Sequence, residues 1–181
     1  MTLSKKIAKY LGDAKYKYEL VEHKTTYTAW DTSQTEKVKP QEVAKALIMK
    51  ADNDYVLALI PANRNLDKQK LLKVINAQKK KNVHPVEYRG AVSRQGGIFH
   101  GVKKIDFAKE AWMKKNLLGK VGATPPFGKM MNLEIYADNL LLKNKKIYLG
   151  SGKYTLSIRV NTSQYLKIES PVKGSFSKSK K

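Results

Sequence analysis

The stretch Ala46-Leu47-Ile48-Met49-Lys50, followed by a second apolar run at Tyr55-Val56-Leu57-Ala58-Leu59-Ile60, decides the fold of this chain. Both runs consist largely of β-prone residues, and the turn-forming residues Asp52-Asn53-Asp54 separate them. Two such runs joined by a short polar turn are typical of an antiparallel β-hairpin. We therefore expect a hairpin here, the clearest one in the chain.

Further helices and strands surround this hairpin. Apolar spacing predicts helices in five segments: 2–11, 40–47 (with Pro40 in its first turn), 66–77, 106–118 and a short one from Thr162 or Ser163. Strands are predicted in four more segments: 18–22, 132–136, 146–149 and 155–160. Because the strands outnumber the helices and do not alternate with them regularly, we expect an α+β fold. Its sheet or barrel should be mixed, mostly antiparallel, and flanked by helices.

Length and composition indicate one domain over 1–170. The chain has 181 residues, of which 41% are hydrophobic, enough for a single core. Residues 78–104 contain Lys79-Lys80-Lys81 and Gly96-Gly97 and show no sustained period, so we interpret them as an insertion. Residues 171–181 are rich in lysine and serine, which predicts a basic, disordered tail.

Charge is the unusual part of the composition. Lysine and arginine total 36 against 15 acidic residues, a formal net charge of +21. Such an excess attracts polyanions such as nucleic acid or an anionic membrane surface. A lysine-rich surface without a binding role is the alternative, but it explains the shortage of acids less well. We therefore expect a polyanionic partner, although charge alone does not say which one.

Several classes of site are excluded by the residues themselves. With no cysteine, disulfides and thiolate chemistry are impossible. Gly150-Ser151-Gly152-Lys153 resembles part of a phosphate loop, but Ile147 replaces its first glycine and Tyr154 its hydroxyl residue. The three histidines, His23, His84 and His100, have no ligand spacing and are interpreted as surface or packing residues, so we expect no metal. No serine lies in a nucleophile-elbow pattern.

Membrane insertion is not expected either. No apolar run approaches the roughly 18 residues of a transmembrane helix, and the first residues lack the apolar core of a signal peptide. We therefore expect a soluble, cytoplasmic protein.

The segment Val121-Gly122-Ala123-Thr124-Pro125-Pro126-Phe127-Gly128 is a candidate site. Its glycines permit unusual backbone angles, and its two prolines stiffen the chain around them. A rigid turn would explain this composition. A stiff loop that holds a substrate through peptide groups would explain it too.

Lys45 is the second candidate, placed between Val43-Ala44 and Ala46-Leu47-Ile48 at the expected junction of helix and strand. As a helical residue it would lie off the apolar stripe and would be an ordinary solvated lysine. Next to a strand end, where side chains converge on a cleft, its ammonium group could instead bind a phosphate or polarise a carbonyl group.

These residues together resemble a known family. The runs Tyr18-Glu19-Leu20-Val21-Glu22-His23, Tyr27-Thr28-Ala29, Val43-Ala44-Lys45-Ala46-Leu47 and Tyr55-Val56-Leu57-Ala58-Leu59-Ile60-Pro61 are similar in order and spacing to those of the YbaK/ProX family. Gly122 and Pro126 match its Gly-x-x-x-Pro loop. Members are free-standing relatives of the editing (insertion) domain of prolyl-tRNA synthetase, and the similarity extends over most of 16–168.

The resemblance implies an aminoacyl-tRNA deacylase that acts in trans and hydrolyses the ester of a mischarged tRNA without metal or cofactor. It implies tRNA(Pro) carrying a small amino acid such as alanine or cysteine, and a synthetase as a possible partner. Lys45, Gly122 and Pro126 would be the catalytic residues, with the adenosine 2′-hydroxyl assisting. Substrate-binding residues would be the following: Tyr27, Thr28, Ala123, Thr124 and Pro125.

Two departures from the family concern specificity. Ser157 stands where some members carry an acidic residue near the pocket, and Asn63 replaces a common aspartate. Two other functions stay open from the sequence: a non-catalytic tRNA- or RNA-binding module on the same fold, and a scaffold whose basic tail binds membrane or ribosome. Retention of Lys45 with the glycine-proline loop favours the deacylase over the first. The lack of a strongly amphipathic basic helix disfavours the second.

Overall fold

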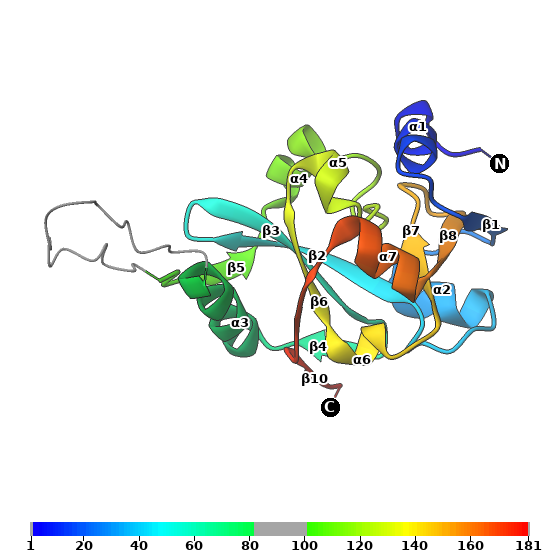
Figure 1. The fold of residues 1–181 in the computed structure, drawn as a ribbon. Coiled ribbons are helices and arrows are strands. Elements are labelled where there is room, and N and C mark those ends of the chain that lie inside the picture. Colours follow the sequence, from blue (N-terminus) through cyan, green and yellow to red (C-terminus); the bar gives the residue numbers. More distant parts are fainter. Residues whose placement is uncertain (1, 82–100, 181) are drawn as a thin grey trace, which may run out of the picture.

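The computed structural model describes residues 2–81 and 101–180 (Figure 1). Its helices are α1 (Lys5–Asp13), α2 (Ala29–Thr35), α3 (Lys68–Lys81), α4 (Glu110–Asn116), α5 (Gly128–Met131), α6 (Asn139–Leu142) and α7 (Thr162–Glu169). Its strands are β1 (Tyr18–Glu22), β2 (Ala44–Ala51), β3 (Asp54–Pro61), β4 (Arg64–Leu66), β5 (Ile105–Phe107), β6 (Glu134–Asp138), β7 (Lys146–Gly150), β8 (Leu156–Asn161), β9 (Val172–Gly174) and β10 (Ser177–Ser179).

The strands form three sheets, which confirms the mixed α+β fold. The largest has the order β5-β2-β3-β6-β9, with antiparallel pairs on the β2 side of β3 and parallel pairs on the β6 side. A second, antiparallel sheet has the order β1-β8-β7, and β10 pairs with β4 in the third. Within the described ranges none of these sheets closes into a barrel.

The predicted hairpin is confirmed as β2 and β3, paired in register from Ala44↔Pro61 to Ala51↔Asp54. Strand β3 is buried on both faces: Leu57 and Leu59 pack in one hydrophobic cluster, and Ala58 and Ile60 in the other. A strand covered on both sides reads as a continuous apolar run instead of an alternating one. That explains why this segment stands out in the sequence.

The helix predicted for 40–47 is wrong. Residues 40–42 form a turn, and the chain is already extended at Ala44, where β2 begins. Every residue of β2 has a pairing partner on β3, and this ladder overrides a local apolar spacing that fits either period. The predicted helix at 106–118 also starts later, as α4, because Ile105–Phe107 forms the edge strand β5.

The disordered tail predicted for 171–181 is also wrong over 172–179. Strand β9 pairs with β6 and β10 pairs with β4, and the side chain of Phe176 between them is fully buried. The buried carboxylate of Asp138 accepts hydrogen bonds of 2.8 Å from the backbone N–H groups of both Phe176 and Ser177. One aromatic side chain and one buried acceptor therefore order a segment whose composition predicts disorder.

The predicted insertion at 78–104 falls largely outside the described residues. Its first residues, up to Lys81, extend helix α3. Near its end, Val102 is buried, and its backbone N–H and carbonyl groups both bond the side chain of Asn76, at 2.7 and 3.1 Å. Over residues 2–81 and 101–180, no helix is long and apolar enough to cross a membrane.

Candidate functional site

Four segments converge on a hollow of about 200 Å³ beside the first residues of β2. They are the start of β2, the segment that leads into α2, the glycine-proline loop and Gly150 at the end of β7. The residues that line the hollow are Tyr27, Thr28, Ala29, Ala44, Lys45, Ala46, Leu47, Gly122, Thr124 and Gly150. We refer to it as the outer hollow. It brings together five of the eight predicted site residues.

Lys45 belongs to a strand, not to a helix, and this decides where its ammonium group lies. It pairs with Ile60 across the hairpin, is half-buried, and its Nζ donates a hydrogen bond of 2.7 Å to the carbonyl oxygen of Arg64 in β4. Burial, and secondarily the positive charge of Lys180, lower the pKa of Lys45 below its usual value. The side chain is therefore fixed at one end of the hollow and partly desolvated, unlike an ordinary surface lysine.

Gly122 is required by the geometry of the loop. Its φ of +87° lies in the left-handed region, and a Cβ there would lie 3.0 Å from the carbonyl oxygen of Tyr27. The loop thus touches the segment that leads into α2, and only glycine permits this approach without strain. This contact closes one side of the outer hollow.

Residues outside the loop donate hydrogen bonds to three of its carbonyl oxygens. The carbonyl oxygen of Ala123 accepts from the N–H of Gly152 at 2.8 Å, and that of Val121 from the hydroxyl group of Tyr154 at 2.7 Å. The carbonyl oxygen of Pro126 accepts from the buried hydroxyl group of Tyr165 at 2.6 Å. Pro126 and its neighbour Pro125 are buried and line neither this hollow nor the one described next. Their contribution is therefore to the shape of the loop.

Two backbone donors of the loop are unused. Among the described residues, the N–H groups of Gly122 and Thr124 have no hydrogen-bond partner, whereas that of Ala123 bonds the carbonyl oxygen of Lys120 at 3.0 Å. Both unused donors belong to residues that line the outer hollow with Lys45. Free peptide N–H groups next to a cation are a means of stabilising a negatively charged oxygen.

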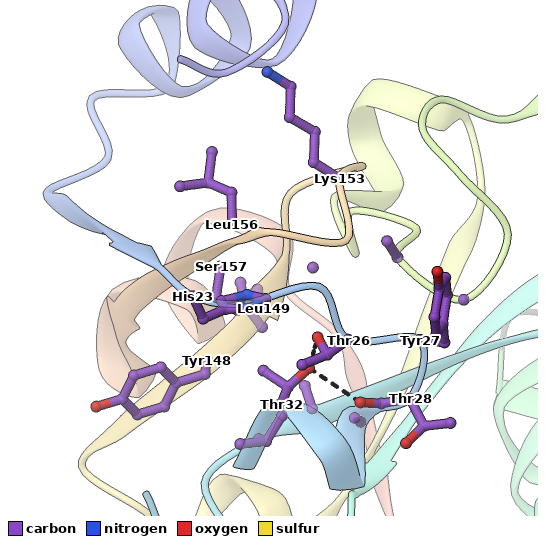
Figure 2. Close-up of a pocket in the computed structure, with 16 residues that line it drawn as sticks. His23, Thr26, Tyr27, Thr28, Thr32, Tyr148, Leu149, Lys153, Leu156 and Ser157 are labelled. Carbon is purple, nitrogen blue, oxygen red and sulfur yellow. Dashed lines mark hydrogen bonds between the residues drawn. The ribbon is translucent and has the colours of Figure 1, made fainter. Parts of the chain in front are cut away.

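A second, smaller hollow of about 40 Å³ adjoins the first and shares six lining residues with it: Tyr27, Thr28, Ala29, Ala44, Gly122 and Gly150. We refer to it as the inner hollow. Figure 2 shows the residues that line it, and four of the labelled polar side chains come from the segment before α2, from α2 and from β8. They are His23, Thr26, Thr32 and Ser157. Ala123, another predicted substrate-binding residue, also lines it.

Two residues that line the inner hollow, His23 and Ser157, form a buried polar group with Glu36, which does not line it. Nδ1 of His23 lies 2.8 Å from the carbonyl oxygen of Lys24, which can only accept, so Nδ1 carries a proton. Nε2 lies 3.1 Å from Oγ of Ser157 and 3.4 Å from Oε1 of Glu36. The His23 and Glu36 side chains are only 3% and 1% exposed. Burial raises the pKa of Glu36, opposed by Ser157 and His23.

The sequence interpretation named Ser157 as a residue near the pocket but missed its two partners. His23 was interpreted as a surface or packing residue, and nothing singled out Glu36. The available signal was the position of His23 in the run that resembles the family, directly after strand β1. Glu36 follows α2 and reaches His23 only through the fold.

Tyr27 and Thr28 lie at the mouth of both hollows. Tyr27 is 65% exposed, and its ring packs edge-on against Tyr154 with centroids 4.9 Å apart. Thr28 is the N-cap of α2, where its Oγ1 accepts from the N–H of Asp31 at 3.1 Å. This cap fixes the direction in which α2 leaves the site. Across residues 2–81 and 101–180, no three histidine, aspartate or glutamate side chains gather as a metal site would require.

Known structures share this architecture over nearly the whole chain. One, described as "a putative trans-editing enzyme for prolyl tRNA synthetase", is 17% identical with a TM-score of 0.74, and the match covers 98% of this chain and 99% of that one. Another, a hypothetical protein, is also 17% identical with a TM-score of 0.73, covering 96% and 100%. At such identities the likeness establishes the fold alone. No curated protein matches the chain.

The α+β fold is thus shared with a structure described as that of "a putative trans-editing enzyme". The family itself follows from the sequence match. The model of the aminoacyl-tRNA editing domain matches residues 23–92 and 98–168, so this chain belongs to the aminoacyl-tRNA editing domain family. The match includes Lys45, the glycine-proline loop, and the His23, Glu36 and Ser157 group.

Proposed function

We propose that this protein is an aminoacyl-tRNA deacylase that acts in trans and hydrolyses the ester between a wrong amino acid and the terminal adenosine of tRNA. The observation that carries the proposal is the outer hollow. There the Lys45 ammonium group and the unused N–H groups of Gly122 and Thr124 come from distant segments to one small space. Membership of the editing-domain family supplies the class of substrate.

The proposed reaction is the addition of water to the ester carbonyl carbon. The carbonyl oxygen becomes negatively charged, and we assign the N–H groups of Gly122 and Thr124 as its donors. The bond between that carbon and the ribose oxygen then breaks, the ribose oxygen takes a proton, and free amino acid and uncharged tRNA leave. Lys45 holds the terminal nucleoside so that the ester lies over the loop. An activated ester needs little beyond orientation and such dipoles, and we propose that no metal takes part.

We propose that the amino acid removed from the tRNA is a small one. The inner hollow opens off the outer one and measures only about 40 Å³, room for a small side chain but not for a branched or aromatic one. Small amino acids differ by only ~1–3 kcal/mol in a binding pocket, so a synthetase that misactivates them needs a second, size-limited site. Alanine, cysteine and serine fit, and tRNA(Pro) is the carrier implied by the resemblance.

The partner is tRNA, and the +21 charge of the chain supports this assignment. Binding should weaken steeply with salt, because lysine contacts with phosphates release counterions, and log K should fall by about 0.9 per duplex phosphate for each unit of log salt concentration. A salt-independent affinity would contradict a role for this charge in tRNA binding. We further propose that the protein works in the cytoplasm and that a synthetase can recruit it.

The test is deacylation of a panel of charged tRNA(Pro) species, carrying alanine, cysteine, serine and proline, in the presence of a chelator. Wild type, Lys45→Ala and the control Lys50→Ala should be compared, since Lys50 is an exposed lysine on the same strand. We expect wild type and Lys50→Ala to hydrolyse one mischarged species and Lys45→Ala to lose this activity while it stays folded. Normal turnover by folded Lys45→Ala would remove Lys45 from the site. Tight tRNA binding without hydrolysis by wild type would identify a binding module instead.

A further inference from the structure

Lys45, which lines the outer hollow, has two other cationic residues near it that play no part in the function proposed above. Lys45 bonds the backbone of Arg64. The Arg64 guanidinium group donates at 3.0 Å to Oγ of Ser179 in β10. Lys180 directly follows this strand, close enough for its charge to act on Lys45. We refer to Lys45, Arg64 and Lys180 as the cation cluster.

Nothing among the described residues neutralises the cation cluster. None of its three members forms an ion pair with an aspartate or glutamate of residues 2–81 or 101–180. The Nε atom of Arg64 is buried and has no hydrogen-bond partner in that part of the chain. Like charges at close range repel one another, more strongly where they are partly desolvated. An anion that bound among them would relieve this repulsion.

Two features position Lys180: the paired strand β10 that precedes it and the ring of Trp30. Strand β10 is paired with β4 through Ser179↔Arg64, and it is anchored upstream by the Asp138 carboxylate. The ammonium group of Lys180 lies 4.6 Å from the ring centroid of Trp30 in helix α2, a cation–π contact. Trp30 is 42% exposed and comes directly after Ala29, which lines both hollows. The lysine thus bridges β10 and α2 at the rim of the site.

We propose that Lys180, with Arg64 beside it, binds the phosphodiester group on the 5′ side of the terminal adenosine of tRNA. This inference rests on the proposed function, because an ester held over the loop on the terminal ribose places the phosphate on the 5′ oxygen of the same ribose just outside the outer hollow. Strand β10 is then a wall of the substrate site. Lys180 acts in binding and takes no part in the chemical step.

The test compares two variants with the same loss of charge. Lys180→Gln removes the proposed contact. Lys173→Gln, in strand β9, removes an exposed lysine from the same part of the chain. We expect Lys180→Gln to raise KM for the mischarged tRNA about three- to tenfold with unchanged kcat, and to reduce the salt slope of log K by about 0.7, the value for one single-stranded phosphate. Lys173→Gln should leave both quantities near wild type, and Lys180→Arg should restore KM.

A second measurement localises the contact and does not depend on hydrolysis. Binding of uncharged tRNA should be compared with binding of the same tRNA from which the 3′-terminal CCA sequence has been removed. We expect Lys180→Gln to weaken binding of the intact tRNA only. Equal weakening of both tRNAs would place Lys180 against another part of the tRNA and overturn the inference.

The outcomes separate the two proposals. If wild type deacylates and the two glutamine variants behave alike, the inference about Lys180 is wrong and the proposed function stands. If wild type hydrolyses none of the charged tRNAs but Lys180→Gln loses affinity for the CCA end, the proposed function is wrong and the phosphate contact stands.

Discussion

The hydroxyl group of Tyr165 donates a 2.6 Å hydrogen bond to the carbonyl oxygen of Pro126, and both groups are buried. Helix α7 therefore holds the glycine-proline loop from the side opposite the outer hollow. Phe127, the next residue, packs edge-on against Tyr16 with ring centroids 5.5 Å apart. The loop that carries the proposed oxyanion donors is thus supported by the core, and its geometry is set before any substrate binds.

We predict that Tyr165→Phe destabilises the protein by about 1–3 kcal/mol, because it leaves the buried Pro126 carbonyl group without its donor. We also expect kcat for deacylation to fall while KM changes little, since a looser loop presents its N–H groups less well. Urea unfolding and steady-state kinetics measure the two effects. Tyr18→Phe, at a partly exposed position of β1, is the matched control and should change neither.

We predict opposite effects of the same substitution at two glycines. Gly122→Ala should destabilise by about 1–2 kcal/mol, because an L-residue is strained at this positive φ, and it should reduce deacylation because the new Cβ presses on Tyr27. Gly12→Ala lies in helix α1 with nothing within 4 Å of its Cβ, and should stabilise by about 0.5–1 kcal/mol. Thermal unfolding of the pair checks the sign. A neutral Gly122→Ala would show that the loop does not need this conformation.

We predict a pH-dependent effect of Glu36→Gln. Burial raises the pKa of Glu36 above its usual 4.5, so the folded state binds its proton more tightly than the unfolded state does. The contribution of Glu36 to stability is therefore complete below about pH 4.5 and is lost as pH rises through the folded pKa. Glutamine does not titrate. The stability of Glu36→Gln relative to wild type should increase from pH 4.5 upward, as measured by urea unfolding at each pH.

One result would contradict this prediction for Glu36. A stability difference that stays constant from pH 4 to 8 would mean that Glu36 titrates alike in the folded and unfolded chain. His23→Gln in the same series is a useful companion. It removes one of the two neighbours, Ser157 and His23, that favour the ionised carboxylate, so the decline of stability with pH should then be steeper.

We predict that Asp138→Ala loosens the segment from Phe176 to Lys180. Asp138 accepts from three backbone N–H groups, of Leu140, Phe176 and Ser177. Leaving buried donors unpaired costs about 1–3 kcal/mol each. We expect a loss of about 3 kcal/mol or more, with faster hydrogen exchange in β10 and a higher KM for tRNA. Asp13→Ala removes an exposed carboxylate from α1 and should leave exchange in β10 unchanged.

The main hairpin was predictable because β3 is buried on both faces and reads as a continuous apolar run. Helix α3 was predictable too, since its buried positions Leu71 and Ile75 keep the spacing of one helical face. The segment 40–47 was not, because its apolar spacing is compatible with a helix and only its pairing with β3 makes it a strand. The order of 172–179 depends on Phe176 and Asp138, which are far apart in sequence.

Part of the site was predictable from the sequence because its residues lie in short local motifs. Lys45, Gly122 and Thr124 lie in local motifs with unusual composition, and the structure brings them to one hollow. Glu36, Arg64 and Lys180 have ordinary sequence surroundings. They acquire a role only through contacts with segments distant in the chain, such as the pairing of β10 with β4. Composition cannot report such contacts.

The pairing of β10 with β4 also has a consequence for biosynthesis. Residues 45 and 64 leave the ribosome early, and their partner at 180 is made more than a hundred residues later. Until residue 180 has been made, the proposed phosphate-binding site has Arg64 but not Lys180. A growing polypeptide that has not reached residue 180 therefore lacks the proposed contact between Lys180 and the end of a tRNA. On the proposed assignment, full affinity for tRNA arises only once translation has passed this residue.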